Sequence, residues 1–131
     1  MTRSRPQDSP ETQTILQAAV GIHNWLGGGH PWAAYREALA CEFALRAIPF
    51  WREPFRPGHA VDFLCSPGIV VDVQRDVDDG RERDVHEVLQ ETGLAFGLRL
   101  DFAGPCLEVH QICLRHGPNL VFQRPAPSAA S

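Results

Sequence analysis

The spacing of apolar residues changes near residue 48, and this change constrains the fold more than any other feature of the sequence. Before it, apolar side chains in 12–26 and 31–47 recur about every three or four residues, as in helices with one buried face. The triple glycine at 27–29 separates these segments, and Pro31 suits the first turn of the second helix. After residue 48 the apolar residues alternate, which is typical of strands. We therefore predict two helices followed by a sheet.

The alternating part of the chain divides into strands and one further helix. The segment 80–92 places its few apolar residues in a polar setting and ends at Gly93, which indicates a surface helix. We expect strands at 48–55, 59–65, 69–74, 94–102 and 106–114. The order ααβββαββ predicts an α/β (α+β) domain, with a mixed β-sheet flanked by helices.

Length and composition fit one domain. The chain has 131 residues, of which 44% are hydrophobic, enough for a single core. We place this domain at 12–122, between flexible tails rich in proline and small residues at 1–11 and 123–131. No apolar run approaches the roughly 20 residues that cross a bilayer, and no apolar signal peptide begins the chain. We therefore expect a cytoplasmic protein with no membrane partner, whose four cysteines are free thiols because none forms a CxxC pair.

The charged residues limit the chemistry available to this chain. All twelve basic residues are arginine, so no lysine ammonium can take part in a reaction. The formal net charge is −4, which argues against a broad nucleic-acid-binding surface.

Two aspartates interrupt the stretch "VDFLCSPGIVVDVQ" at 61–74, which otherwise looks built for a core. If the hairpin folds about Pro67, then Asp62 lies opposite Asp72, and strand alternation puts Gln74 on the face of Asp72. Two opposed carboxylates repel each other unless one is protonated or a cation lies between them. A magnesium ion would satisfy both. The other interpretation is a shifted register, or an Asp62 that pairs with an arginine such as Arg99.

Several motifs in this order resemble the small GxxExxY family of the PD-(D/E)XK nuclease superfamily. They are "IHNWLGGG" at 22–29, "GHPWAAY" at 29–35, "AVDFLC" at 60–65, "IVVDVQ" at 69–74 and "LQETGLAFGLRLDF" at 89–102. The resemblance covers roughly 12–114 and implies a restriction-endonuclease-like fold. Gly29 and Tyr35 match the motif that gives the family its name, whereas Trp32 replaces the glutamate of that motif.

The resemblance implies a metal-dependent site whose parts are partly replaced here. Asp62 and Asp72 match the family's metal-binding acids, and Gln74 replaces its lysine. Asp84 stands where the family has a glutamine in the helix after the third strand. A working site of this kind would use Mg²⁺ or Mn²⁺ to cut nucleic acid, with DNA favoured over RNA. The replacements favour a degenerate nuclease that binds nucleic acid or a protein partner with weak or no catalysis. The alternative is an active nuclease in which Gln74 orients the attacking water. His23 either flanks this cleft or packs in the fold.

Overall fold

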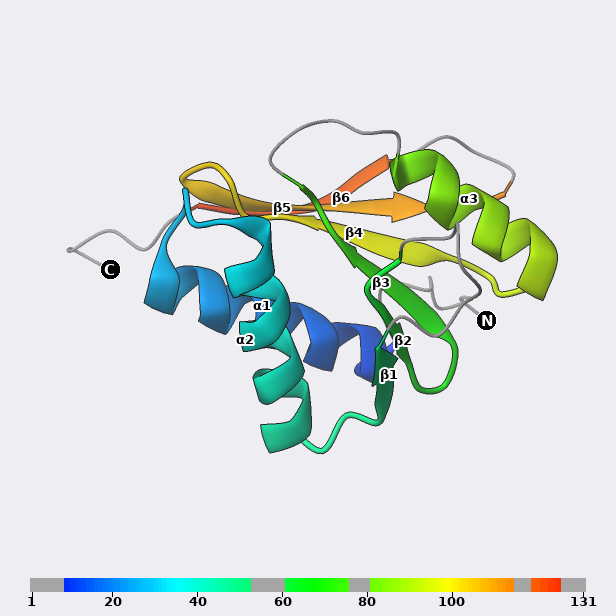
Figure 1. Ribbon diagram of the computed structural model, residues 1–131, viewed down its shortest axis with the longest axis horizontal. Helices are drawn as coiled ribbons and strands as arrows, with labels where there is room; N and C mark the ends of the chain where they lie inside the picture. Colours follow the sequence, from blue (N-terminus) through cyan, green and yellow to red (C-terminus); the bar gives the residue numbers. More distant parts are fainter. Residues whose placement is uncertain (1–8, 53–60, 76–80, 115–118, 126–131) are drawn as a thin grey trace, which may run out of the picture.

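The computed structural model describes residues 9–52, 61–75, 81–114 and 119–125, and these contain three helices and six strands (Figure 1). The order along the chain is that predicted from the sequence, followed by one further strand. The elements are α1 (Pro10–Leu26), α2 (Trp32–Leu45), β1 (Phe50–Arg52), β2 (Phe63–Cys65), β3 (Ile69–Val73), α3 (Arg81–Thr92), β4 (Gly97–Asp101), β5 (Cys106–Ile112) and β6 (Asn119–Pro125).

All six strands form one mixed sheet in which the strands follow their chain order. Neighbouring strands are antiparallel except β3 and β4, which are parallel. A parallel pair needs a crossover connection, and α3 lies within the one that joins these two strands. The predicted mixed sheet is therefore confirmed.

The sheet lies between two layers of helix. In Figure 1, α1 and α2 lie below the sheet and α3 lies above it. Two clusters of buried side chains match these layers, because one joins α1 and α2 to the sheet and the other joins α3 to it. Strand β3 contributes to both clusters, and all five of its residues are buried. Among the described residues, no helix is long and apolar enough to cross a membrane.

The glycines at the helix ends act as the sequence predicts, whereas α1 begins at Pro10, two residues inside the expected N-terminal tail. Ser9 caps α1, because its side-chain oxygen accepts the backbone N–H of Thr12 at 3.1 Å. Gly27 ends this helix with a φ of +74°, and Gly93 follows α3 with a φ of +75°. Both values lie in the left-handed region, where glycine is favoured because it has no Cβ.

The structure differs from the predicted strand boundaries in two respects. The sheet gains β6 at Asn119–Pro125, so it reaches three residues into the expected C-terminal tail. The observed strands are also shorter than predicted, since β2 begins at Phe63 and β4 at Gly97. Alternating sequence marks where a strand can form, whereas the ends depend on which backbone groups find partners. The rest of the first predicted strand, at 53–55, lies outside the described residues.

The turn between α1 and α2 is packed tightly against the turn between β4 and β5. A Cβ added at Gly28 would lie 2.7 Å from the carbonyl oxygens of Ala103 and Gly104, and 3.1 Å from that of Phe102. These backbone oxygens cannot move aside as a flexible side chain can. Gly28 thus allows the turn between α1 and α2 to pack directly on the turn between β4 and β5.

The substitution Gly28→Ala should destabilise the protein by about 1–3 kcal/mol, because the methyl group would force these backbones apart. Gly21→Ala is a matched control inside α1, where the new Cβ would find only the end of the Arg46 side chain at 3.7 Å. That change should stabilise the protein by up to about 1 kcal/mol, because alanine favours helix. Urea unfolding of both variants measures the difference, and equal effects would contradict the close packing at Gly28.

The Cys65 thiol should be inert in the folded protein. Its side chain is fully buried, and burial raises the pKa of the thiol to about 12 because the thiolate is poorly solvated there. Cys41 is exposed. In a timed iodoacetamide reaction analysed by mass spectrometry, Cys41 should be modified in the folded protein, and Cys65 only after denaturant is added. Labelling of Cys65 at the rate of Cys41 would contradict this burial.

Candidate functional site

The hairpin formed by β2 and β3 has the register that the sequence predicts. Phe63 pairs with Val71, and the pairs Leu64–Val70 and Cys65–Ile69 follow. The described pairing ends at Phe63 and Val71, and Asp62 lies just outside β2. The alternative of a shifted register is therefore wrong for the described pairs.

Asp72 lies within β3 and is fully buried. Its neighbours Val71 and Val73 belong to the cluster under α1 and α2, whereas Val70 belongs to the cluster under α3. Strand alternation therefore directs Asp72 toward the α3 face. Gln74 follows two residues later in the same alternation, is half buried, and donates its backbone N–H to the Leu100 carbonyl at 2.7 Å.

The parallel strand β4 places an arginine beside Asp72. Arg99 is the register partner of Asp72, and only 6% of its surface is exposed. Register partners on neighbouring strands direct their side chains to the same face. A buried carboxylate is costly unless a charge of opposite sign accompanies it, and the register places Arg99 where it can supply that charge.

Asp62 lies just before β2 and is also buried, with 2% of its surface exposed. One carboxylate oxygen, Oδ2, accepts the backbone N–H of Val73 at 2.8 Å and the indole N–H of Trp32 at 3.5 Å. The other oxygen, Oδ1, forms an ion pair with Arg36 Nε at 3.4 Å. Asp62 therefore pairs with an arginine, as one interpretation of the sequence expects, and that arginine is Arg36 of α2. Asp62 ties the first turn of α2 to the end of β3.

Trp32 lies against two guanidinium groups. The Arg75 guanidinium carbon is 3.9 Å from the centre of the indole ring, and that of Arg36 is 5.4 Å away. Both distances are within the range in which a cation is attracted to the face of an indole. We call Trp32, Arg36, Asp62 and Arg75 the Trp32 cluster. It holds two cations and one anion, so its formal charge is positive although the chain is acidic overall.

The Trp32 cluster does not suit the magnesium site that the resemblance implies. Both Asp62 oxygens already face donors, and an indole has one N–H donor and no oxygen to offer a metal. The Arg36 guanidinium beside the carboxylate and the Arg75 guanidinium against the indole would both repel a metal cation. Within the described part of the chain, no group of three or more His, Cys, Asp or Glu side chains is placed to hold a metal ion. The side chains of the Trp32 cluster therefore do not fit a magnesium ion.

The residues that match the family's named motif have structural contacts. Gly29 adopts a φ of +87°, a conformation that favours glycine. The Tyr35 hydroxyl donates to the Gly27 carbonyl at 2.5 Å and accepts the backbone N–H of His30 at 3.1 Å. The Tyr35 ring also stacks on Phe102, with ring centres 4.5 Å apart. Tyr35 thus closes the turn between α1 and α2 and fixes it to the sheet.

Two further predicted site residues lie apart from the Asp62 contacts described above. His23 is buried in α1, where its Nε2 lies 2.9 Å from the Gly104 carbonyl and its ring lies near Phe102. Of the two interpretations of His23, its contacts favour packing. Asp84 is half buried in α3, the helix that covers the Asp72 face of the sheet.

Sequence reasoning missed Arg36 and Arg75, which complete the Trp32 cluster. Arg36 follows Trp32 by four residues, and side chains with this spacing are neighbours on a helix. That spacing could have indicated a stacked pair. Arg75 follows Gln74 directly and has no comparable signal, because its stacking on Trp32 depends on how α2 packs against the sheet.

The substitution Asp62→Ala should destabilise the protein by about 3 kcal/mol, because it removes the opposite charge beside the mostly buried Arg36 and the acceptor of the Val73 N–H. Asp101→Ala is a matched control, since its carboxylate accepts only the exposed Ala103 N–H among the bonds described. That loss should cost about 1 kcal/mol or less. Denaturant unfolding with a double-mutant cycle on Arg36→Met should show coupling at Asp62, and additive effects would contradict the ion pair.

Comparison of the whole chain with models of known protein families, with curated proteins and with solved structures found no match. The similarity to the GxxExxY family therefore rests on the motifs quoted from the sequence and on their order.

Proposed function

We propose that this chain is a nuclease-like domain of the GxxExxY type that binds nucleic acid without cutting it. The observation that carries the proposal is the state of Asp62, whose carboxylate is engaged by Arg36, Trp32 and the Val73 N–H. In a cutting site of this class, that carboxylate would face a metal ion. Here a guanidinium supplies the positive charge instead.

The absence of lysine supports the same conclusion. Metal-dependent phosphodiester cleavage needs carboxylates that hold the ion and a cation that stabilises the charge developing on phosphate. Gln74 can orient a water, but its amide carries no charge. Removing one such electrostatic group commonly costs about 3–4 kcal/mol of the barrier, a loss of roughly 100-fold to 1000-fold in rate.

The Trp32 cluster supports binding of nucleic acid at the same place. Guanidiniums contact phosphates, and an indole can stack on a base. Arg36 and Arg75 bring both kinds of group together on an otherwise acidic chain. We favour DNA over RNA, as the resemblance implies, and expect weak, salt-dependent affinity because few cations take part.

The alternative function is an active nuclease that uses Mg²⁺ with Gln74 placing the water, and it would require the Asp62 carboxylate to leave α2 and join Asp72 on the α3 face. Cleavage assays on linear and single-stranded DNA, with Mg²⁺ or Mn²⁺, separate the two functions. The wild type should show no metal-dependent product and should retain DNA in a low-salt gel-shift assay. Cleavage that Asp72→Asn abolishes would overturn the non-cutting proposal. A wild type that neither cuts nor retains DNA would overturn nucleic-acid binding.

A rebuilt site gives the converse test. The variant Trp32→Glu, Arg36→Ala, Gln74→Lys adds a third acid, releases Asp62 and restores the lysine. It should bind Mn²⁺ more tightly than the wild type in calorimetric titration and should cut DNA detectably. Adding Asp72→Asn should remove that activity, and circular dichroism checks that each variant is folded. A folded rebuilt variant that neither binds metal nor cuts would contradict the assignment of Asp62, Asp72 and Gln74 as a former nuclease site.

A further inference from the structure

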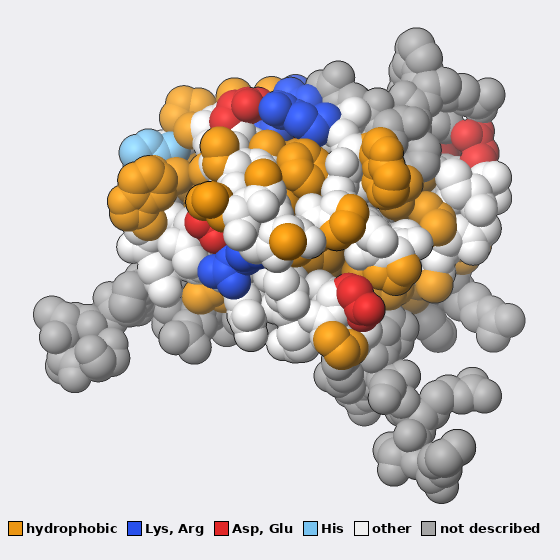
Figure 2. Space-filling model, turned by 90° about the horizontal axis from the view of Figure 1, so that it is seen from below, with side chains coloured by type: hydrophobic (Ala, Val, Ile, Leu, Met, Phe, Trp, Pro, Cys, Tyr) orange, Lys and Arg blue, Asp and Glu red, His pale blue; other side chains and the backbone are white. Residues whose placement is uncertain are grey.

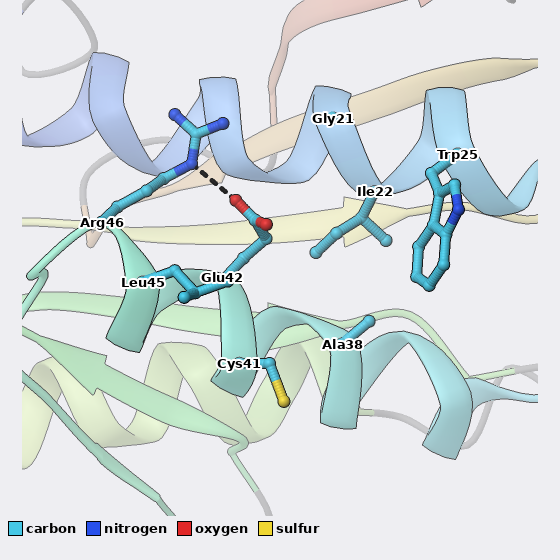
Figure 3. Close-up of a pocket in the computed structure, with 8 residues that line it drawn as sticks. All are labelled: Gly21, Ile22, Trp25, Ala38, Cys41, Glu42, Leu45 and Arg46. Atoms are coloured by element: carbon cyan, nitrogen blue, oxygen red, sulfur yellow. Dashed lines mark hydrogen bonds and ion pairs between the residues drawn. The ribbon is translucent and has the colours of Figure 1, made fainter.

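A groove between α1 and α2 lies on a surface that the Trp32 cluster does not use. It has a volume of about 500 Å³ and is lined by Gly21, Ile22, Trp25, Ala38, Cys41, Glu42, Leu45 and Arg46 (Figure 3). We call it the α1–α2 groove. Hydrophobic side chains are spread over the face of the molecule that these two helices form (Figure 2).

The groove ends in two large apolar side chains that are unusually exposed. Trp25, near the end of α1, is 79% exposed, and Leu45, at the end of α2, is 80% exposed. They lie at opposite ends of the groove (Figure 3). Single exposed apolar residues are common, but two that frame one apolar groove mark an interaction surface.

The charges in the groove are balanced. Glu42 and Arg46 form an ion pair one helical turn apart, with Arg46 Nε 2.7 Å from the Glu42 carboxylate. The groove therefore presents no net charge, and a copy of the same acidic chain can approach it without repulsion there. A polyanion such as nucleic acid finds no excess of positive charge in it.

We propose that a second copy of this chain occupies the α1–α2 groove in a two-fold symmetric dimer. A two-fold axis through the middle of the groove exchanges its ends, so Trp25 of each copy meets Leu45 and Arg46 of the other. The indole would bury its apolar face on Leu45 and place its ring against the Arg46 guanidinium. The proposal is independent of whether the Trp32 cluster binds nucleic acid.

The centre of the groove permits the two copies to approach closely. Gly21, Ala38 and Cys41 have small side chains, and Cys41 is exposed. The proposed axis passes near them, so the two Cys41 thiols of a dimer lie close together.

The size of the helical face fits a dimer of modest strength. The 17 residues of α1 and the 14 of α2 span about 26 Å and about 21 Å. Two such helices side by side would cover roughly 500 Å² on each copy, or roughly 1,000 Å² in total, near the lower limit of a specific interface. We expect dissociation in the micromolar range, as is typical of small interfaces.

Sedimentation velocity over a range from low micromolar to near millimolar tests the proposal. The wild type should shift from monomer to dimer as the concentration rises. Trp25→Glu, which places a charge in both halves of the interface, should raise the dissociation constant by at least about 100-fold. Trp51→Glu is the matched control: Trp51 is 55% exposed on β1, outside the groove, and this change should leave the dissociation constant unaltered.

A short bis-maleimide, which adds to two thiols without a redox step, reports the geometry independently. In a Cys106→Ser, Cys113→Ser background, which removes the two half-buried thiols, it should link the protein into covalent dimers, and adding Cys41→Ser should abolish the product. A wild type that stays monomeric at every concentration would overturn the proposal and leave the groove to an unlike partner. A dimer that persists unchanged in Trp25→Glu, or a cross-link that survives Cys41→Ser, would also overturn it.

Discussion

The burial of β3 on both faces is the constraint on which the rest of the structure depends. A strand that reaches solvent on neither side needs a helix layer above and below, and α1, α2 and α3 supply these layers. The parallel pairing of β3 with β4 uses one of these layers, because α3 carries the chain back across the sheet from the end of β3 to the start of β4. The only charged residue of β3 is Asp72, and Arg99 of β4 lies beside it in the register.

Asp62 is a residue that could have bound a metal but is held by contacts within the fold instead. Asp62 lies where the β2–β3 register ends, and its carboxylate accepts the Val73 N–H just beyond the last described pair of these strands. Arg36 and Trp32 then attach the same carboxylate to α2. These contacts join three elements, so the group is held as part of the fold. This is why we propose binding by a nuclease-like domain without cleavage.

Two surfaces of the molecule differ in charge and in what they can recognise. The Trp32 cluster gathers two guanidiniums about an indole, whereas the α1–α2 groove is apolar with one internally balanced ion pair. The first therefore suits an anion, and the second suits an apolar surface such as a copy of the same chain. Because α2 contributes to both surfaces, dimer formation can bring two Trp32 clusters into one particle.

The sequence by itself determined the first eight elements, their order and the hairpin register, but not β6. The apolar spacing and the glycines at 27–29 and 93 are local signals, and Pro67 centres a turn whose length sets which residues pair. Tertiary structure decided the partners of the charged groups. Arg36 and Arg75 lie 39 positions apart in the sequence, yet both lie against Trp32. Which guanidinium reaches Asp62, and whether that carboxylate faces an arginine or an open cleft, depends on the angle at which α2 packs on the sheet. That angle results from the contacts of the whole core, and no short stretch of sequence encodes it.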